Sequence, residues 1–310
     1  MNFLPIVFTC DNNYYKYTNV VITSILHHIN KNTQYEFNIL SEFISEENKE
    51  ITFKQVKKYK NVKVKFIELK DFDATKFYTN SYFNTSTYFR LYIPELFKNY
   101  DKILYLDGDL IVSHDLTSMI NIDFENKLAL GCLSNFIVDR IKSNDDPKYP
   151  LAYFTDKLKM PRPEEYFNAG VMVYNLDKIR NEDVDKKVFV ALEEISQPKL
   201  LDQDLLNSVF NRNGGIKLIN QKYNNTRRFK ITHKRLIFNA FLKLIGLNNN
   251  INNQLFYIYH FAGKDKPWNH ENVDTKLFYY YACKSPFIKD IVETNNKKLN
   301  FLEKYIYRNF

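Results

Sequence analysis

The stretch KILYLDGDLIV, residues 102–112, is strongly apolar but has two carboxylates in its middle, Asp107 and Asp109, separated only by Gly108. Its flanks are typical of a buried strand. Such a strand rarely contains unpaired acids, because removing an ionised carboxylate from water costs several kcal/mol or more. We therefore expect the acids to lie where the strand leaves the core. A glycine between them permits a backbone geometry that a side chain can forbid.

Strand and helix patterns alternate through the first half of the chain. Four ranges have strand patterns: 4–10, 35–40, 62–69 and 102–112. Apolar residues recur at helical spacing in 15–29, and Ser45 is a candidate N-cap for a second helix. This order predicts an α/β fold with a mainly parallel central sheet and helices on both faces. Ligands of such sheets bind beyond the carboxyl ends of the strands, where Asp107 and Asp109 should lie.

The later segments are less regular. Four patterns stand out: a short helix at 86–97 that Pro94 interrupts, a strand at 165–176, the start of a helix at 201–211 and a strand at 255–263. The composition becomes basic and then Asn-rich after about residue 220. We therefore expect a main domain at 1–268, with a basic insertion or lid at 221–254. A small, basic, helical extension at 269–310 is a candidate for membrane association.

Composition restricts the setting in which the chain works. The three cysteines are far apart and match neither a zinc spacing nor a disulfide framework, so a reducing compartment is expected. The N-terminus has the pattern of a first strand rather than a signal peptide. No apolar run reaches the ~18–20 residues that span a bilayer. The net charge of +8 suits nucleic acid, an anionic membrane surface or an acidic substrate, or serves solubility alone.

Asp107 and Asp109 offer hard oxygen ligands to a divalent cation. His260, at the end of a predicted strand, could add an imidazole, which favours Mn²⁺ over Mg²⁺. Such a site would leave positions for phosphate oxygens, and a cation on a diphosphate neutralises charge on a leaving group. The alternative is structural: Asp107 caps a turn, Asp109 forms a surface salt bridge, and His260 is a hydrogen-bonded residue at a strand end.

Two common nucleotide motifs are absent from the sequence. There is no G-x-x-x-x-G-K-[ST], and no G-x-G-x-x-G follows the first strand. TCDNNYY stands there instead. Asp11 and Asn13 could hydrogen-bond a uracil or a ribose, and Tyr14 could stack on a base.

Six stretches together resemble the retaining glycosyltransferases of family 8, which include bacterial lipopolysaccharide galactosyl- and glucosyltransferases. They occur in the order of the family and span most of the chain to about Trp268: VFTCDNNY, STYFRL, KILYLDGDLIV, FNAGVMVYNL, DQDLLN and HFAGKDKPW. The resemblance implies a GT-A type, single Rossmann-like domain that binds a nucleotide sugar. The tail KLFYYYACKSPF is similar to the C-terminal extension of the lipopolysaccharide enzymes.

The resemblance also implies roles for individual residues. These are Thr9, Asp11, Asn13 and Tyr14 for uridine; Arg90 for the sugar or the diphosphate; Asp107, Asp109 and His260 for Mn²⁺, with Asp107 also near the ribose or the sugar; Gly263 and Lys266 for the diphosphate; and Asn168, Asp202 and Gln203 for the sugar. Taken singly, Asn168 could make a turn, Asp202 could cap a helix and Lys266 could be solvated. Trp268 could belong to the core or form an acceptor platform.

The implied activity is transfer of galactose or glucose from a UDP-sugar to a glycan acceptor, lipopolysaccharide or another surface glycan, with retention at the anomeric carbon. Gln203 stands where the resemblance places the group on the far face of the sugar, with Asp202 beside it. Asp204 is the nearby carboxylate, but it would have to move to act as a nucleophile. A same-face attack is therefore favoured.

The acceptor could be lipid-linked, and the implied location is the cytoplasmic face of the cell membrane, at its anionic surface. Two rival functions are a metal-dependent UDP-sugar hydrolase and a basic nucleic-acid-binding protein. Nucleic-acid binding would leave the D-x-D, D-Q-D and H-x-x-G-x-x-K-P-W pieces unexplained.

Overall fold

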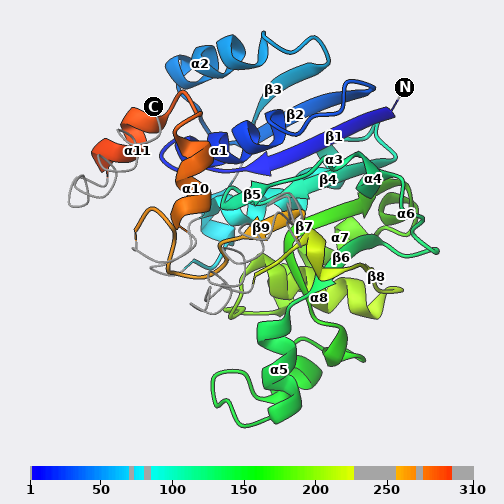
Figure 1. The fold of residues 1–310 in the computed structure, drawn as a ribbon. Coiled ribbons are helices and arrows are strands. Elements are labelled where there is room, and N and C mark those ends of the chain that lie inside the picture. Colours follow the sequence, from blue (N-terminus) through cyan, green and yellow to red (C-terminus); the bar gives the residue numbers. More distant parts are fainter. Residues whose placement is uncertain (1, 70–72, 80–84, 227–255, 270–274, 295–310) are drawn as a thin grey trace, which may run out of the picture.

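A seven-stranded sheet forms the centre of the molecule (Figure 1). The computed structural model describes residues 2–69, 73–79, 85–226, 256–269 and 275–294. The strands, in spatial order, are β3 Val62–Glu68, β2 Thr33–Ser41, β1 Asn2–Thr9, β4 Lys102–Leu106, β7 Phe167–Asn175, β6 Ala129–Leu133 and β8 Lys217–Leu218. Strands β3, β2, β1 and β4 are parallel, whereas β7 is antiparallel to both its neighbours. The expected mainly parallel sheet is confirmed, with β7 as the exception.

Helices cover both faces of this sheet. Alternate residues of each strand point to opposite faces, so they belong to different hydrophobic clusters. Val7 and Tyr105 enter the cluster with α5, α7 and α8, whereas Ile6 and Leu104 enter the cluster with α1 and α4. The helices are α1 Tyr15–Leu26, α2 Glu46–Val56, α3 Ile93–Leu96, α4 Thr117–Ile120, α5 Asn135–Ser143, α6 Leu176–Asn181, α7 Val184–Glu194, α8 Asp202–Arg212, α10 Thr275–Ala282 and α11 Ile288–Thr294. Ser45 caps α2, as predicted, by accepting the N–H of Asn48.

The apolar stretch 102–112 forms two strands rather than one. Strand β4 ends at Leu106, and the chain resumes as β5, Leu110–Val112, in a separate two-stranded sheet with β9, Ile258–His260. The antiparallel pairing of β5 with β9 places Leu110 opposite His260. The two acids therefore lie in the connection between two sheets, and the smaller sheet brings His260 beside them.

Gly108 is needed for space rather than for an unusual backbone angle, which corrects the expectation from the sequence. Its φ lies outside the left-handed region that Gly263 occupies. A Cβ at position 108 would overlap Thr18 Oγ1 and lie 3.2 Å from the Tyr14 ring. The connection between β4 and β5 therefore packs directly on α1.

Pro94 also acts differently from the prediction. Residues Thr85–Tyr92 form a 3₁₀-helix, and α3 follows it with Pro94 in its first turn. A proline is favourable there, since its missing N–H would have no partner within the helix. Pro94 therefore belongs to the start of a helix instead of interrupting one.

The C-terminal helices α10 and α11 pack against α1 (Figure 1). Trp268 is buried in this contact, where it stacks on Tyr17 with ring centroids 4.0 Å apart, and Phe278 packs against it with ring centroids 5.1 Å apart. Trp268 is thus a core residue. The basic segment beyond Thr226 and the basic residues after Thr294 lie outside the described residues.

Two further expectations concern the cysteines and membrane spans. Cys10 and Cys132 are buried and Cys283 is half-buried, and all three are free thiols. Among the helices that the structure describes, none combines the length and the apolarity required to cross a bilayer.

We expect Phe278→Ala to destabilise the protein by about 3–5 kcal/mol, because it leaves a cavity between α10 and Trp268. Phe278 is 1% exposed. Tyr280 on the same helix is 45% exposed, so Tyr280→Ala is the matched control and should cost less than about 1 kcal/mol. Urea unfolding measures both changes. Equal losses would mean that α10 is not anchored through its buried face.

Candidate functional site

Three acceptor side chains converge beyond the carboxyl end of β4. Asp107 and Asp109 come from the connection between β4 and β5, and His260 comes from the end of β9. One potential ligand atom of each residue lies within 4.8 Å of the others. His260 Nε2 is 3.6 Å from Asp107 Oδ2 and 3.3 Å from Asp109 Oδ1. Two carboxylates this close repel one another unless a cation lies near them, so the arrangement suits a divalent ion.

Gly170 on β7 makes room for this cluster. A Cβ at position 170 would overlap His260 Cε1 and lie 2.5 Å from Asp107 Oδ2. The backbone of β7 also holds the loop, since Gly170 O accepts the N–H of Asp107 at 2.8 Å. The residues present therefore fit a divalent cation, and two carboxylates with one imidazole suit Mn²⁺.

Arg90 links this cluster to the start of α8. Its guanidinium lies 3.1 Å from Asp107 Oδ1 and 2.6 Å from Asp202 Oδ2, and it donates to the Ala169 carbonyl at 2.6 Å. Burial alone would lower the pKa of Arg90, but the two carboxylates outweigh it and raise the pKa above its ordinary value. Arg90 is therefore a permanent buried cation between two acids.

Asp202 keeps one acceptor atom for a ligand. Its Oδ1 accepts the Thr87 hydroxyl at 2.5 Å, and Leu201 rather than Asp202 is the N-cap of α8. Its Oδ2 accepts no hydrogen bond from any described residue, since the Nε–H of Arg90 points to the Thr87 carbonyl. Burial raises the pKa of Asp202 to about 6 against the opposing effect of Arg90. A sugar hydroxyl is the kind of donor that this buried oxygen requires.

Gln203 and Asp204 are held in place differently. Gln203 Oε1 accepts the N–H of Ala169 at 3.0 Å and the amide of Asn168 at 3.2 Å. Asp204 is fully buried and accepts three hydrogen bonds, from the hydroxyls of Tyr153 and Tyr166 and from the N–H of Leu200. Burial raises the pKa of Asp204, and these hydrogen bonds oppose the rise. To reach a ligand, Asp204 would have to lose all three.

The residues expected around uridine lie at the end of β1. Asp11 Oδ1 accepts the N–H of Tyr14 at 2.7 Å, and Asn13 is exposed. The Thr9 hydroxyl is 2.9 Å from the hydroxyl of Tyr105, which in turn donates to Asp107 Oδ1 at 2.7 Å. Thr9 is thus joined to the acidic cluster through a tyrosine that the sequence did not indicate.

Lys266 lies beside the acidic cluster rather than in solvent. Its ammonium donates to Asp109 Oδ2 and to the Phe261 carbonyl. Burial would raise the pKa of Asp109, but Lys266 and His260 outweigh it and hold the pKa well below its usual range. Gly263 has φ +87°, in the left-handed region, and turns the chain between β9 and Lys266.

Three supporting residues were missed: Tyr105, Gly170 as a spacer, and Asn224, whose Oδ1 is 2.9 Å from His260 Nδ1. Asn168, one of the predicted sugar-binding residues, lies between Gln203 and Asn224. Gly170 could have been recognised as a strand glycine, which often marks a close approach. Tyr105 lies within KILYLDGDLIV, but nothing in that stretch marks its hydroxyl, and Asn224 lies in none of the six stretches.

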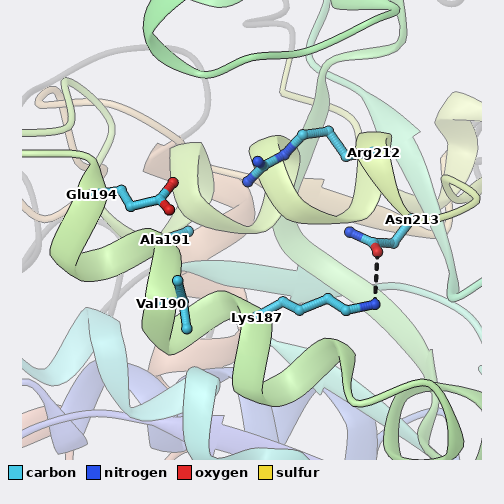
Figure 2. Close-up of a pocket in the computed structure, with 6 residues that line it drawn as sticks. All are labelled: Lys187, Val190, Ala191, Glu194, Arg212 and Asn213. Carbon is cyan, nitrogen blue, oxygen red and sulfur yellow. Dashed lines mark hydrogen bonds between the residues drawn. The ribbon is translucent and has the colours of Figure 1, made fainter.

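The groove in Figure 2 is a different feature. It has a volume of about 310 Å³ and lies between α7 and the end of α8, with Lys187 and Val190 on one side and Arg212 and Asn213 on the other. Asp202 begins α8, so this groove lies at the opposite end of that helix. It contains none of the acidic cluster.

Comparison with known proteins agrees with this geometry. A glycosyltransferase assigned in Haemophilus influenzae is 30% identical over 270 residues, which are 86% of this chain and 73% of that protein. A lipopolysaccharide 1,2-glucosyltransferase of Escherichia coli is 26% identical, over 84% of this chain and 71% of its own. The solved structure of the galactosyltransferase LgtC in complex with donor and acceptor sugar analogues has a TM-score of 0.70 at 25% identity, and covers 94% of this chain and 100% of its own. The glycosyl transferase family 8 model matches residues 5–272. The chain belongs to glycosyl transferase family 8.

Proposed function

We propose that the protein is a retaining hexosyltransferase that moves galactose or glucose from a UDP-sugar to a glycan acceptor, lipopolysaccharide or another surface glycan. One observation carries the proposal: the cluster of Asp107, Asp109 and His260 lies directly beside Arg90, which also contacts Asp202. A cation site and a buried sugar-hydroxyl acceptor therefore share one buried guanidinium. The two relatives named above act on different hexoses, so both donors remain in the proposal.

Asp107, Asp109 and His260 would hold Mn²⁺, or Mg²⁺ in its place. When bound, the ion would supply positive charge for the departing diphosphate. Lys266 is the second cation for that group, because its ammonium already lies next to Asp109 and follows the turn at Gly263. An ammonium beside a departing phosphate stabilises the charge that develops there.

The donor would lie across the carboxyl ends of β1 and β4. Asp11, Asn13 and Tyr14 at the end of β1 would hold the uridine together with the backbone of Thr9. Asp202 Oδ2 forms an ion pair with Arg90 but accepts no hydrogen bond from the described residues, and it would accept a sugar hydroxyl. Arg90 would orient both Asp107 and Asp202 by charge.

We favour transfer by attack on the same face from which UDP departs. The acceptor oxygen forms a bond to the anomeric carbon, the bond to the UDP oxygen breaks, and the hydroxyl proton passes to the departing diphosphate. Two arrangements support this route over a covalent intermediate. Gln203 Oε1 already accepts two hydrogen bonds, which weakens it as a nucleophile, and Asp204 is fixed by three donors. Gln203 would instead stabilise positive charge on the sugar through its carbonyl dipole.

We also propose that the enzyme works at the inner, anionic face of the cell membrane on a lipid-linked acceptor. The support is compositional: the net charge is +8, and basic residues are mixed with aromatic ones near the C-terminus. Most of these residues lie outside the described part of the chain, and α10 uses its buried face to pack on α1.

Gly170→Ala should lower the affinity for Mn²⁺ at least about tenfold, because the added methyl group forces His260 and Asp107 apart; a tenfold change equals about 1.4 kcal/mol. Gly131→Ala, on the neighbouring strand β6, is the matched control. Its Cβ would lie 2.9 Å from Ile216 Cδ1, the end of an aliphatic side chain, and would approach none of the three candidate ligands, so Mn²⁺ affinity should not change. Titration calorimetry of the purified protein with MnCl₂ measures both. Wild-type affinity in Gly170→Ala would contradict the assigned ligands.

Asp109→Ala should abolish Mn²⁺-dependent turnover while the fold is retained, because one of three ligands is lost. A screen of UDP-sugars with Mn²⁺, with and without EDTA, identifies the donor, and UDP release with and without acceptor separates a transferase from a hydrolase. Asp177→Ala, which removes an exposed carboxylate on α6, is the control and should leave turnover unchanged. Full activity in Asp109→Ala would remove the basis of the proposal, and equal UDP release without acceptor would favour the hydrolase.

A further inference from the structure

We propose that Asn224 is a positioning residue that fixes the proton of His260 on Nδ1 and, through Asn168, links His260 to the amide of Gln203. This inference rests on the proposed function only in assigning a cation to the other nitrogen of His260. Asn224 is 1% exposed and follows the short 3₁₀-helix Gln221–Tyr223. It is located far from every motif that identified the site in the sequence.

Backbone N–H groups determine the orientation of two side-chain amides, those of Asn168 and Gln203. The N–H of Gly170 lies 3.0 Å from Asn168 Oδ1, and the N–H of Ala169 lies 3.0 Å from Gln203 Oε1. A backbone N–H can only donate, so the atoms that face these groups must be carbonyl oxygens. Asn168 therefore directs its NH₂ group at Gln203 Oε1, at 3.2 Å.

The orientation of Asn168 then fixes Asn224. Asn168 Oδ1 is also 2.8 Å from the side chain of Asn224, which must present its NH₂ group there because the oxygen can only accept. The remaining atom of that amide, Asn224 Oδ1, is 2.9 Å from His260 Nδ1. An oxygen that can only accept requires a proton on Nδ1. Nε2 is then the ring nitrogen on the side that faces Asp107 and Asp109, and it is the one available to a cation.

The same sense of donation continues beyond Gln203. The NH₂ group of Gln203 donates to the Tyr166 hydroxyl at 3.2 Å, and that hydroxyl donates to Asp204 Oδ1 at 2.6 Å. Every member from His260 to Asp204 thus donates to the next, and each donor is polarised by the bond before it. Asp204 is the acceptor at the end of this series of hydrogen bonds, which gives the buried carboxyl group a function other than nucleophilic attack.

Two consequences follow for the site. An acceptor on Nδ1–H fixes the ring and strengthens Nε2 as a ligand, an effect that is typically worth 10- to 100-fold in metal affinity. The series of hydrogen bonds also couples the acidic cluster to the proposed sugar pocket, since Asn168 contacts both Asn224 and Gln203. A substitution that breaks these hydrogen bonds at Asn224 should therefore affect both cation binding at His260 and the position of Gln203.

Two substitutions separate these effects. Asn224→Ala removes the acceptor for His260 and the donor for Asn168. Asn224→Asp keeps an acceptor for Nδ1–H, but its carboxylate cannot donate to Asn168 Oδ1. Asn211→Ala is the matched control, because Asn211 is a buried asparagine on α8 that makes two hydrogen bonds to the backbone of Arg162, and the chain does not include it.

The measurement is ¹H–¹⁵N NMR of the metal-free protein labelled at histidine, with the His260 signal assigned by its loss in His260→Gln. The wild type and Asn211→Ala should show an exchange-protected Nδ1–H, Asn224→Asp should retain it, and Asn224→Ala should lose it. In calorimetry, Asn224→Ala should bind Mn²⁺ about 10- to 100-fold more weakly, whereas Asn224→Asp retains the affinity but has a kcat at least about tenfold lower.

A protected Nδ1–H and unchanged Mn²⁺ affinity in Asn224→Ala would overturn the inference. An equal loss of affinity in Asn211→Ala would also overturn it, because the effect would then be general destabilisation. If Asn224→Ala fails to fold, Asn224→Asp decides: loss of the Nδ1–H there contradicts the chain. The NMR experiment does not depend on turnover, so failure to use any UDP-sugar would refute the proposed function and leave this test intact.

Discussion

The structure depends on the packing of two carboxylates and one imidazole into a single partly buried space against the backbone of β7. Each acid directs one oxygen to a cationic side chain and the other to His260: Asp107 uses Arg90, and Asp109 uses Lys266. Arg90 and Lys266 therefore compensate the charges of the two carboxylates. The remaining carboxylate oxygens, Asp107 Oδ2 and Asp109 Oδ1, face His260 Nε2. Two carboxylate oxygens and an imidazole nitrogen that face one point are the ligands that a divalent cation prefers, which is why we interpret the cluster as a metal site.

The three side chains meet at one place in the fold, beyond the end of β4. The strand stops before Asp107, the chain crosses to a second sheet, and the pairing of β5 with β9 brings His260 back to the acids. Strand β7 approaches closely from the other side, because position 170 has no side chain. The antiparallel β7 also has Asn168 near its beginning, so the strand that departs from the parallel pattern connects the cluster to Gln203 on α8.

Local patterns were sufficient for the first three strands, for the cap of α2 by Ser45, and for the three candidate ligands. They were insufficient wherever a distant partner decides the outcome. The apolar run 102–112 reads as one strand, and its division depends on the pairing of β5 with β9. Strand β6 was missed, although alternate residues of LALGCL pack on both faces of the sheet. Asn224 has a role only because the fold places it between His260 and Asn168, and no spacing in the sequence encodes that position.

The three polar residues at the start of α8 have three different surroundings. Of the three polar residues in DQD, Asp202 forms an ion pair with Arg90, Gln203 accepts a hydrogen bond from the backbone of β7, and Asp204 accepts hydrogen bonds from two tyrosines. A helix turns by about 100° per residue, so consecutive side chains must face different surroundings. The carboxylate that could attack a sugar is thereby the one directed into the core. A mechanism that needs no protein nucleophile is consistent with this arrangement, since Asp204 is held by three hydrogen bonds.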